Sequence, residues 1–332
     1  MKPAHDVHAI DAVAGRSDGN LRRGLSGRDA SGPRAVPAQT ATVRDRVLAY
    51  VALTKPRIVE LLLITTVPAM ILAARGVPSL ELMVATLFGG ALAAGGANAL
   101  NCYIDRDIDR IMGRTRRRPL PRHQIAPRSA VIFGLILGTV SFAFMWAAIN
   151  FLAAALTLGA LLFYVFVYTL GMKRSTPQNI VIGGAAGAVP ALVGWAAVTG
   201  GVGLPALVLF GIVFYWTPPH FWALSLRYSK EYEAAGVPMM PVVYGKKETT
   251  RHIVLYSLLL FAVSLILLPV AHLGAVYLAA CLGLNGMFIF KAVRLAAAPA
   301  PRSAWNLFHF SNYYLALLFT AAAADVLIGP LL

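Results

Sequence analysis

An all-α membrane protein is the fold that the sequence predicts, with nine transmembrane helices surrounding a central apolar cavity. Of its 332 residues, 58% are apolar and 13% are charged, a composition too hydrophobic for an ordinary soluble domain. Apolar stretches of about 20 residues, the length that a helix needs to cross a bilayer, recur along the chain. The basic residues are also distributed as expected for the loops of a multi-pass membrane protein. Together these observations exclude a soluble enzyme.

The N-terminal segment differs from the rest of the chain. Residues 1–46 contain no aromatic residue and no apolar run long enough for a signal peptide, so we expect a disordered basic tail. Acidic residues interrupt this segment, which argues against a mitochondrial transit peptide and favours a protein of the bacterial inner membrane. The membrane domain is then expected at residues 47–332.

Nine apolar stretches define the predicted spans of this domain. The connections after the third and the seventh are so short that we expect antiparallel helical hairpins at these two places. The spans are predicted at residues 57–75, 80–104, 129–148, 151–170, 180–198, 204–226, 252–270, 272–292 and 305–330.

Charge placement tests this division independently and gives an orientation. The net charge is +15, and all but one of the 29 Lys and Arg residues lie either in the N-terminal segment through Arg57 or at the ends of even-numbered spans and in the loops that follow them. Arg75 is the exception. Because cytoplasmic loops are rich in Lys and Arg, we expect the N-terminus in the cytoplasm, the C-terminus outside and the chemistry facing the cytoplasm. A charge excess of this kind reflects topology, so no nucleic-acid partner is expected.

A polar motif at the end of the second span is the main candidate site. Asn101, Asp105 and Asp109 are spaced four residues apart and would share one face of a helix. Two carboxylates on adjacent turns near a helix C-terminus repel each other unless a cation binds them. Mg²⁺ suits this site because it takes one or two carboxylates together with waters and substrate phosphate oxygens. Asp107 should point elsewhere and pair with an Arg, and the alternative for the motif is a solvated helix end.

Cationic residues follow the acids and predict a polyanionic substrate. Arg114 and Arg118, in the loop 113–123, are candidates to hold a diphosphate against the metal, because guanidinium groups bind phosphate bidentately. The alternative for this loop is a simple topology signal. A second group of cationic and polar residues, here called the second rim, follows the fourth span. It either contacts the substrate or consists of side chains at a helix end that extend toward the membrane interface. The second rim comprises Lys173, Arg174, Thr176 and Asn179.

The sixth span carries an ionisable side chain, which is a functional candidate by default. His220 could bind an iron, donate a hydrogen bond or act as a base, and the alternative is a buried histidine satisfied within the protein. Just beyond this span, Glu231 and Glu233 could hold a second Mg²⁺ or pair with neighbouring cations. Cys102 and Cys281 give neither a disulfide framework nor a metal-binding spacing, so we interpret both as packing residues.

These motifs resemble those of the UbiA superfamily of intramembrane prenyltransferases. The resemblance covers about residues 48–330 and rests on the acidic motif with its Arg-rich loop, on the segment 168–179, and on the runs 217–224 and 235–241. The last two runs are similar to those of the branch that modifies haem. One departure from the wider superfamily is the second acidic motif, where many members carry two aspartates and this chain has Glu231 followed by Tyr232.

The resemblance implies an activity and a set of ligands. The reaction would be transfer of the farnesyl group of farnesyl diphosphate to a vinyl group of haem B, with addition of water, inside the lipid bilayer. The implied cofactor is Mg²⁺, and haem A synthase and cytochrome oxidase assembly are the implied protein partners. The catalytic residues would be Asn101, Asp105, Asp109 and Lys173, and the metal ligands Asp105, Asp109 and Glu231. The diphosphate would contact Arg114, Arg118, Lys173, Arg174, Thr176 and Asn179, and the haem would contact His220 and Tyr228.

Two other functions fit parts of the sequence. A prenyltransferase of the same superfamily could act on a quinone precursor or a chlorophyll-type acceptor, although the runs 217–224 and 235–241 argue against this. A multi-span transporter would also explain the many spans and the intramembrane acids. Its central site would lie near the membrane midplane, however, whereas the acids and cations of this chain gather at one end of the spans. Metal-dependent release of diphosphate would exclude the transporter.

Overall fold

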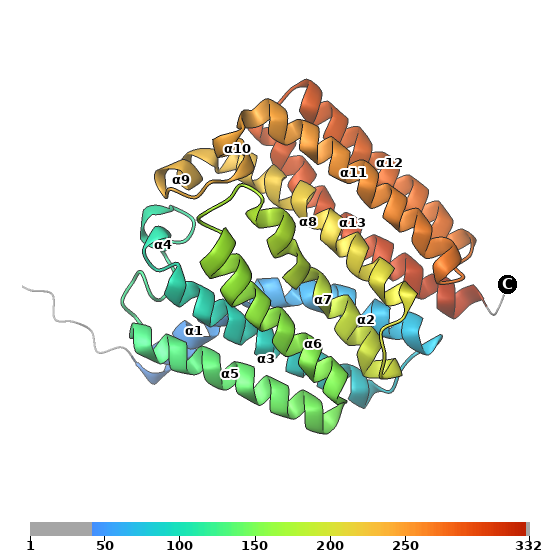
Figure 1. Ribbon diagram of the computed structural model, residues 1–332, viewed down its shortest axis with the longest axis horizontal. Helices are drawn as coiled ribbons and strands as arrows, with labels where there is room; N and C mark the ends of the chain where they lie inside the picture. Colours follow the sequence, from blue (N-terminus) through green and yellow to red (C-terminus); the bar gives the residue numbers. More distant parts are fainter. Residues whose placement is uncertain (1–41, 330–332) are drawn as a thin grey trace, which may run out of the picture. The chain divides into compact units, whose positions relative to one another are not determined.

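The computed structural model describes residues 42–329 of the chain, without the side chains of residues 57–63. Within this range every regular element is a helix (Figure 1). The predicted tail lies outside the described residues except at its end, which forms the beginning of α1 (Val43–Thr54). Thr42 starts this helix with a capping box, in which its hydroxyl accepts a hydrogen bond from Asp45 N and the Asp45 carboxylate accepts one from Thr42 N.

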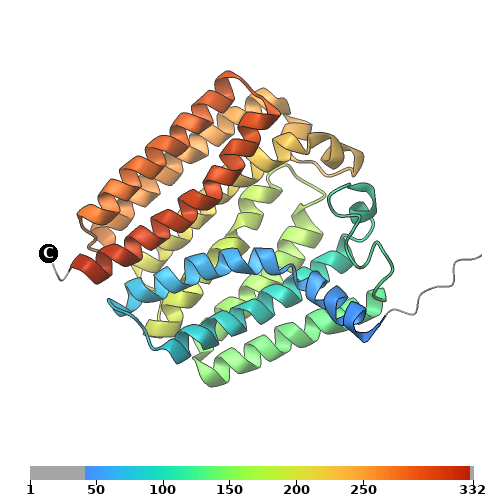
Figure 2. The same cartoon turned by 180° about the vertical axis from the view of Figure 1, so that it is seen from behind.

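Long helices run side by side through the rest of the structure, and their ends lie close to the predicted span limits (Figures 1 and 2). The helix α6 continues directly into a π-helix, η1, so that these two together form one span. In chain order the long helices are α2 (Pro56–Ala74), α3 (Leu80–Ile104), α5 (Pro127–Ala148), α6 (Phe151–Leu162), η1 (Phe163–Met172), α7 (Asn179–Thr199), α8 (Leu204–Arg227), α11 (Gly245–Val270), α12 (Ala275–Ala297) and α13 (Pro301–Ile328).

Eight helices of the described range are long and apolar enough to cross a membrane. The described apolar part of α2, Ile64–Ala74, is shorter. The chain is therefore an integral, multi-pass membrane protein, as predicted. Two helices begin at least four residues before their predicted spans, α11 at Gly245 and α13 at Pro301, because a helix can continue beyond the hydrocarbon core into the polar interface.

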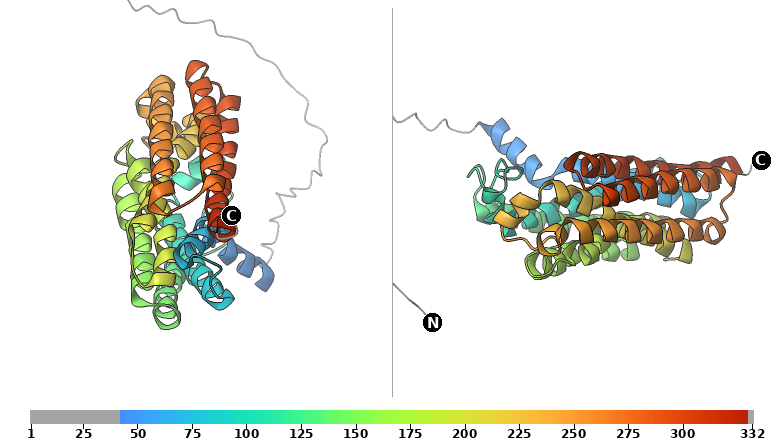
Figure 3. Two further views of the ribbon diagram at one scale, coloured as in Figure 1. Left: turned by 90° about the vertical axis from the view of Figure 1, so that its right-hand side faces the viewer. Right: turned by 90° about the horizontal axis from the view of Figure 1, so that it is seen from above.

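Three short helices lie together at one end of the long ones. They are α4 (Ile108–Ile111), α9 (Ser229–Ala234) and α10 (Met240–Val243), and Figure 1 shows them on the same side of the bundle. Seen from above in Figure 3, they lie at the end where α1 also lies. The acidic motif and the cationic loops are therefore brought to the same end of the helices.

Small residues allow the helices to approach closely. A Cβ atom on Gly96 of α3 would lie 2.7 Å from the carbonyl oxygen of Gly134 of α5, and one on Gly194 of α7 would lie 2.6 Å from the carbonyl oxygen of Thr66 of α2. Neither position has space for a side chain, and such close packing is what holds helices together in a bilayer. Helix α2 packs against α3, α7 and α13.

Polar groups inside the C-terminal helices satisfy one another. The Asp325 carboxylate of α13 accepts hydrogen bonds from Gly274 N at 2.6 Å and Tyr277 N at 2.7 Å, and so caps the start of α12. Both cysteines are free and buried, which confirms their interpretation as packing residues. These groups stabilise helix packing, and the candidate site is built elsewhere.

Candidate active site

The acidic motif lies where α3 ends and the chain turns toward α4. The prediction of one continuous helix through this motif is wrong, because α3 ends at Ile104 and a turn follows at residues 105–107. Aspartate is a poor helix former that favours turns, and this segment has two within three residues. The i to i−4 bonding nevertheless persists, since Asp105 N donates to Asn101 O and Asp109 N donates to Asp105 O, each at 2.9 Å. Asp105 and Asp109 are consequently both buried, at 0% and 2% exposure.

Asp105 is surrounded by donor groups from α3 and from the turn that follows η1. Its Oδ2 atom accepts hydrogen bonds from Lys173 Nζ and, at 2.8 Å, from Asn101 Nδ2. Asn101 Nδ2 also lies 3.2 Å from Thr169 Oγ1 of η1, which fixes the amide between the two helices. The Asp105 Oδ1 atom is buried and has no hydrogen bond, and Arg174 Nη2 lies 3.7 Å away. A buried carboxylate oxygen without a hydrogen-bond donor is a group that a bound cation would satisfy.

Asp109 is held by the loop that follows it. Arg118 Nη1 donates to both carboxylate oxygens of Asp109, at 2.9 and 2.7 Å. The Thr115 hydroxyl donates to the backbone oxygen of Asp109 at 3.1 Å, so the loop folds back over the acid. The structure thus brings Arg118 and Asp109 together, as expected for a metal and diphosphate site in which cations stand beside the acids.

Asp107 points away from the two buried acids. Its carboxylate accepts hydrogen bonds from Arg174 Nη1 at 2.6 Å and Nη2 at 2.7 Å, which confirms the predicted pairing with an Arg. These bonds lower the pKa of Asp107 to about 2. Arg174 is therefore shared between the exposed Asp107 and the buried Asp105.

The rest of the second rim shapes the turn that carries Lys173. Asn179 Nδ2 donates to the backbone oxygens of Thr176 at 2.7 Å and Lys173 at 3.4 Å. The Thr176 hydroxyl accepts a hydrogen bond from Gln178 N at 3.2 Å. Asn179 Oδ1 is buried and has no hydrogen-bond partner. Thr176 and Asn179 thus position the turn, and their contact with a diphosphate stays a prediction.

Arg114 connects the loop to α9. Its Nη2 atom donates to Tyr232 OH at 3.2 Å, its backbone N donates to Glu231 Oε2 at 3.4 Å, and its guanidinium carbon lies 5.6 Å from the centre of the Tyr228 ring. Glu231 therefore lies against the Arg114 backbone. Within residues 42–329, outside the undescribed side chains, no three His, Cys, Asp or Glu side chains gather as a metal cage. Two carboxylates suffice for Mg²⁺ when a diphosphate completes its coordination, so Asp105 and Asp109 fit this ion.

Two residues of the site were missed by sequence analysis. Lys55, between α1 and α2, donates a hydrogen bond from Nζ to Asn101 Oδ1 at 2.8 Å, and Thr169 contacts the same amide. Burial is the main cause that lowers the pKa of Lys55 to about 8. The sequence shows that Lys55 is a cation next to an apolar span. Its contact with Asn101, 46 positions away, depends on helix packing and could not be predicted.

His220 is fixed inside the bundle between α8 and α13. Its ring stacks on Trp216 at 4.3 Å and lies 4.6 Å from Phe308, and its Nδ1 is 2.6 Å from Ser311 Oγ. The single hydroxyl hydrogen of Ser311 is directed to Phe308 O, also at 2.6 Å. With the Ser311 hydroxyl hydrogen directed to Phe308 O, Ser311 Oγ accepts a hydrogen bond from His220 Nδ1, and in that tautomer the lone pair is on Nε2.

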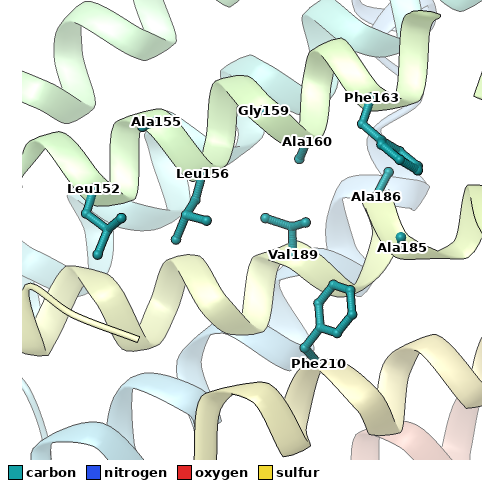
Figure 4. A pocket seen from close by; sticks show the side chains of 10 residues that line it. All are labelled: Leu152, Ala155, Leu156, Gly159, Ala160, Phe163, Ala185, Ala186, Val189 and Phe210. Carbon is teal, nitrogen blue, oxygen red and sulfur yellow. The ribbon is translucent and has the colours of Figure 1, made fainter. Parts of the chain in front are cut away.

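An apolar pocket of about 380 Å³ lies beside η1 (Figure 4). Figure 4 shows side chains from α6, η1, α7 and α8 around it, including Leu156, Phe163, Val189 and Phe210. All ten lining residues are apolar, and Gly159 and four alanines leave space between the larger side chains. The sequence analysis predicted a central cavity surrounded by all nine spans, whereas the lining residues of this pocket come from three of them, α6 with η1, α7 and α8.

Comparison with known proteins gives consistent matches. Residues 62–318 match the model of the UbiA prenyltransferase family. The chain is 53% identical to the protoheme IX farnesyltransferase of Parafrankia sp. (strain EAN1pec), over 90% of this chain and 96% of that protein. It is 55% identical to the protoheme IX farnesyltransferase of Cutibacterium acnes, over 86% of each chain.

Solved structures share the fold at low sequence identity. A UbiA homologue from Archaeoglobus fulgidus bound to DMAPP and Mg²⁺ aligns with a TM-score of 0.59 and 18% identity, covering 82% of this chain and 98% of that chain. Digeranylgeranylglyceryl phosphate synthase aligns with a TM-score of 0.71 and 19% identity, covering 85% of this chain and 99% of that chain.

Proposed function

The chain belongs to the UbiA prenyltransferase family, and we propose that it transfers the farnesyl group of farnesyl diphosphate to a vinyl group of haem B. The observation that carries this proposal is the pair of buried carboxylates, Asp105 and Asp109, each held by cations at one end of the helices. The farnesyl donor and the haem acceptor are those named for relatives that are more than half identical to this chain.

Asp105 and Asp109 would hold Mg²⁺, which neutralises negative charge on the departing diphosphate. The unsatisfied Asp105 Oδ1 atom supports this assignment. Lys173 and Arg118 lie on the same two carboxylates and can donate hydrogen bonds to diphosphate oxygens that approach them. Arg174, which lies against Asp105 and Asp107, and Arg114, which lies against α9, are the further cations assigned to the diphosphate. Glu231 would help to bind a second metal cation near Arg114. This assignment rests on the sequence resemblance alone.

The charge distribution favours cleavage of the allylic C–O bond. The electron pair of that bond leaves with the diphosphate, where fixed cations stabilise it without reorganisation. The π electrons of the haem vinyl group then form the new C–C bond, and the resulting porphyrin-stabilised cation takes up water and releases a proton, giving haem O. The apolar pocket beside η1 suits the farnesyl chain, because its size is in the range of ligand pockets and none of its lining side chains is a nucleophile that could capture an allylic cation.

His220 is the residue assigned to haem. Its Nε2 lone pair is of the type that binds iron, and Trp216 and Phe308 hold the ring in place. Tyr228 is the second assigned contact, and it lies between Arg114 and Arg227, at 5.6 and 5.9 Å from their guanidinium carbons. Cations of this kind can pair with the haem propionates.

The proposed topology has nine spans, a cytoplasmic N-terminus and an external C-terminus, in a bacterial inner membrane. The distribution of Lys and Arg supports this topology. Among the described residues, Arg75 is the single Lys or Arg at the end of the spans that is assigned to the outside, and the others lie at the end assigned to the cytoplasm. The active site would then face the cytoplasm, and the product would pass to haem A synthase for cytochrome oxidase assembly. A cysteine introduced beside Arg75 should react with a membrane-impermeant thiol reagent from outside the cell, and labelling only after lysis would contradict this orientation.

An acceptor panel tests the activity. Diphosphate release from farnesyl diphosphate is measured with haem B, with a phenolic quinone precursor and without acceptor, each with Mg²⁺ or EDTA. Release that needs both Mg²⁺ and haem B supports the proposal. Release that needs the phenolic acceptor instead would assign the chain another acceptor within the family.

A further inference from the structure

The joint between α1 and α2 places a single lysine at the candidate site. Lys55 ends α1 and precedes Pro56, the first residue of α2, with φ of 53° and ψ of 64° in the left-handed region. A residue other than glycine adopts this conformation at a cost of about 1 kcal/mol or more, so the surrounding structure must hold it. Two amides on successive turns of α3 do so: Asn98 Nδ2 donates to Thr54 O at 2.9 Å, and Asn101 Oδ1 accepts from Lys55 Nζ at 2.8 Å.

The ammonium of Lys55 differs from the other cations of the site in its hydrogen-bond partner. Lys173, Arg118 and Arg174 each form an ion pair with an aspartate. Among the described side chains, the hydrogen-bond partner of the Lys55 ammonium is the neutral amide of Asn101, and no carboxylate pairs with it. A partly buried ammonium that the described side chains leave without a paired carboxylate would be stabilised by a bound anion.

The position of Lys55 relates it directly to the acids. Asn101 bridges the two groups, because its Oδ1 accepts from Lys55 while its Nδ2 donates to Asp105 Oδ2 at 2.8 Å. Lys55 and Lys173 therefore approach the Asn101–Asp105 pair from different elements, the α1–α2 joint and the end of η1. An anion bound at Asp105 through a cation would lie between two ammonium groups.

We propose that Lys55 is a further diphosphate-binding residue, whose ammonium is held ready by Asn101 and neutralises the substrate's phosphate oxygens. This inference rests on the proposed function, because it concerns the same diphosphate site. It also assigns a role to the bend between α1 and α2, which brings the lysine in from a segment far from the acidic motif in sequence.

Binding of inorganic pyrophosphate tests the inference without the transfer reaction. The full chain in lipid nanodiscs is titrated with pyrophosphate in the presence of Mg²⁺ by calorimetry. Lys55→Met keeps the length of the side chain and removes its charge, and it should weaken pyrophosphate binding at least about tenfold, the value of one charge-assisted hydrogen bond. Lys55→Arg should retain most of the affinity. Lys247→Met, at an exposed position in α11, is the matched control and should bind as the parent protein does.

A double-mutant cycle separates direct binding from positioning. If Lys55 acted only by orienting Asn101, Lys55→Met would add no loss to Asn101→Ala, and that result would overturn the inference. We expect a further loss of affinity in the double variant. Thermal midpoints of all variants check folding, and Lys55→Gln replaces Lys55→Met if the latter does not fold.

The outcomes distinguish this inference from the function on which it rests. A parent protein that fails to bind pyrophosphate with Mg²⁺ would overturn both the diphosphate site and the role of Lys55. A parent protein that binds pyrophosphate while Lys55→Met binds equally well would overturn the role of Lys55 alone and leave the proposed function intact.

Discussion

Replacing the three aspartates one at a time should separate catalytic from surface carboxylates. Asp105→Asn and Asp109→Asn should abolish turnover, whereas Asp107→Asn should leave it nearly unchanged. The two classes differ in burial, since Asp105 and Asp109 are 0% and 2% exposed while the Asp107 side chain is 60% exposed. All three aspartates lie within five residues of the chain. A nonspecific effect of substitution on the folding of this loop should therefore be similar in the three variants.

The expected magnitudes follow from these environments. Losing a buried carboxylate that holds Mg²⁺ removes several kcal/mol of charge stabilisation, which corresponds to a decrease in kcat/KM of more than about 10²-fold. Asp105→Asn also leaves Lys173, whose side chain is 14% exposed, without its partner, at a cost in stability of about 3–5 kcal/mol. The exposed Asp107–Arg174 pair contributes about 0.2–1 kcal/mol, so Asp107→Asn should change kcat/KM less than about fivefold.

Turnover and thermal midpoint are measured for each variant in the same lipid nanodiscs. The double variant Asp105→Asn with Lys173→Met removes both members of the buried pair and should recover stability without recovering activity. Equal loss of activity in all three single variants would refute the assignment of Asp105 and Asp109 as the metal-binding pair. Recovery of activity in the double variant would show that the effect of Asp105→Asn came from folding.

Three further predictions concern the pocket, the helix packing and the haem contact. Gly159→Leu, at a wall position where a Cβ atom would meet nothing within 4 Å, should raise KM for farnesyl diphosphate at least about tenfold, whereas Gly283→Leu on α12 should not. Gly96→Ala would place a Cβ 2.7 Å from Gly134 O, so it should lower stability by about 1–3 kcal/mol, and an unchanged midpoint in a thermal melt would contradict the close packing of α3 and α5. His220→Ala should weaken haem binding in an absorbance titration, and unchanged binding and turnover would eliminate its assigned role.

Local spacing made much of the site predictable. Four-residue spacing indicated that Asp105 and Asp109 would lie together and that Asp107 would not, and the backbone bonds that follow α3 preserve this relation. The predicted end of the second span at residue 104 agrees with the end of α3, but the turn at residues 105–107 was not predicted, because apolar periodicity gives no signal within a short polar segment. The partner of Asp107 was expected to be an Arg, but its identity as Arg174 depends on how η1 packs beside α3.

Contacts between distant segments were beyond the reach of the sequence pattern. Lys55 reads as one more basic residue at the start of a span, and only the bend before Pro56 and the packing of α1 on α3 bring it to Asn101. The apolar pocket is likewise formed by residues from α6, η1, α7 and α8. These residues are of the same types as those that face lipid or the protein core elsewhere in the chain. Hydropathy predicts that such residues are in the membrane and not which of them enclose a pocket.

The mass of the haem recovered after reaction shows directly whether haem B accepts the farnesyl group. Purified protein in nanodiscs is incubated with haem B, farnesyl diphosphate and Mg²⁺, and a parallel sample contains EDTA. We predict a product that carries one added farnesyl group and one water, formed with Mg²⁺ and absent with EDTA. Unchanged haem from a preparation that releases diphosphate with a phenolic acceptor would contradict haem as the substrate.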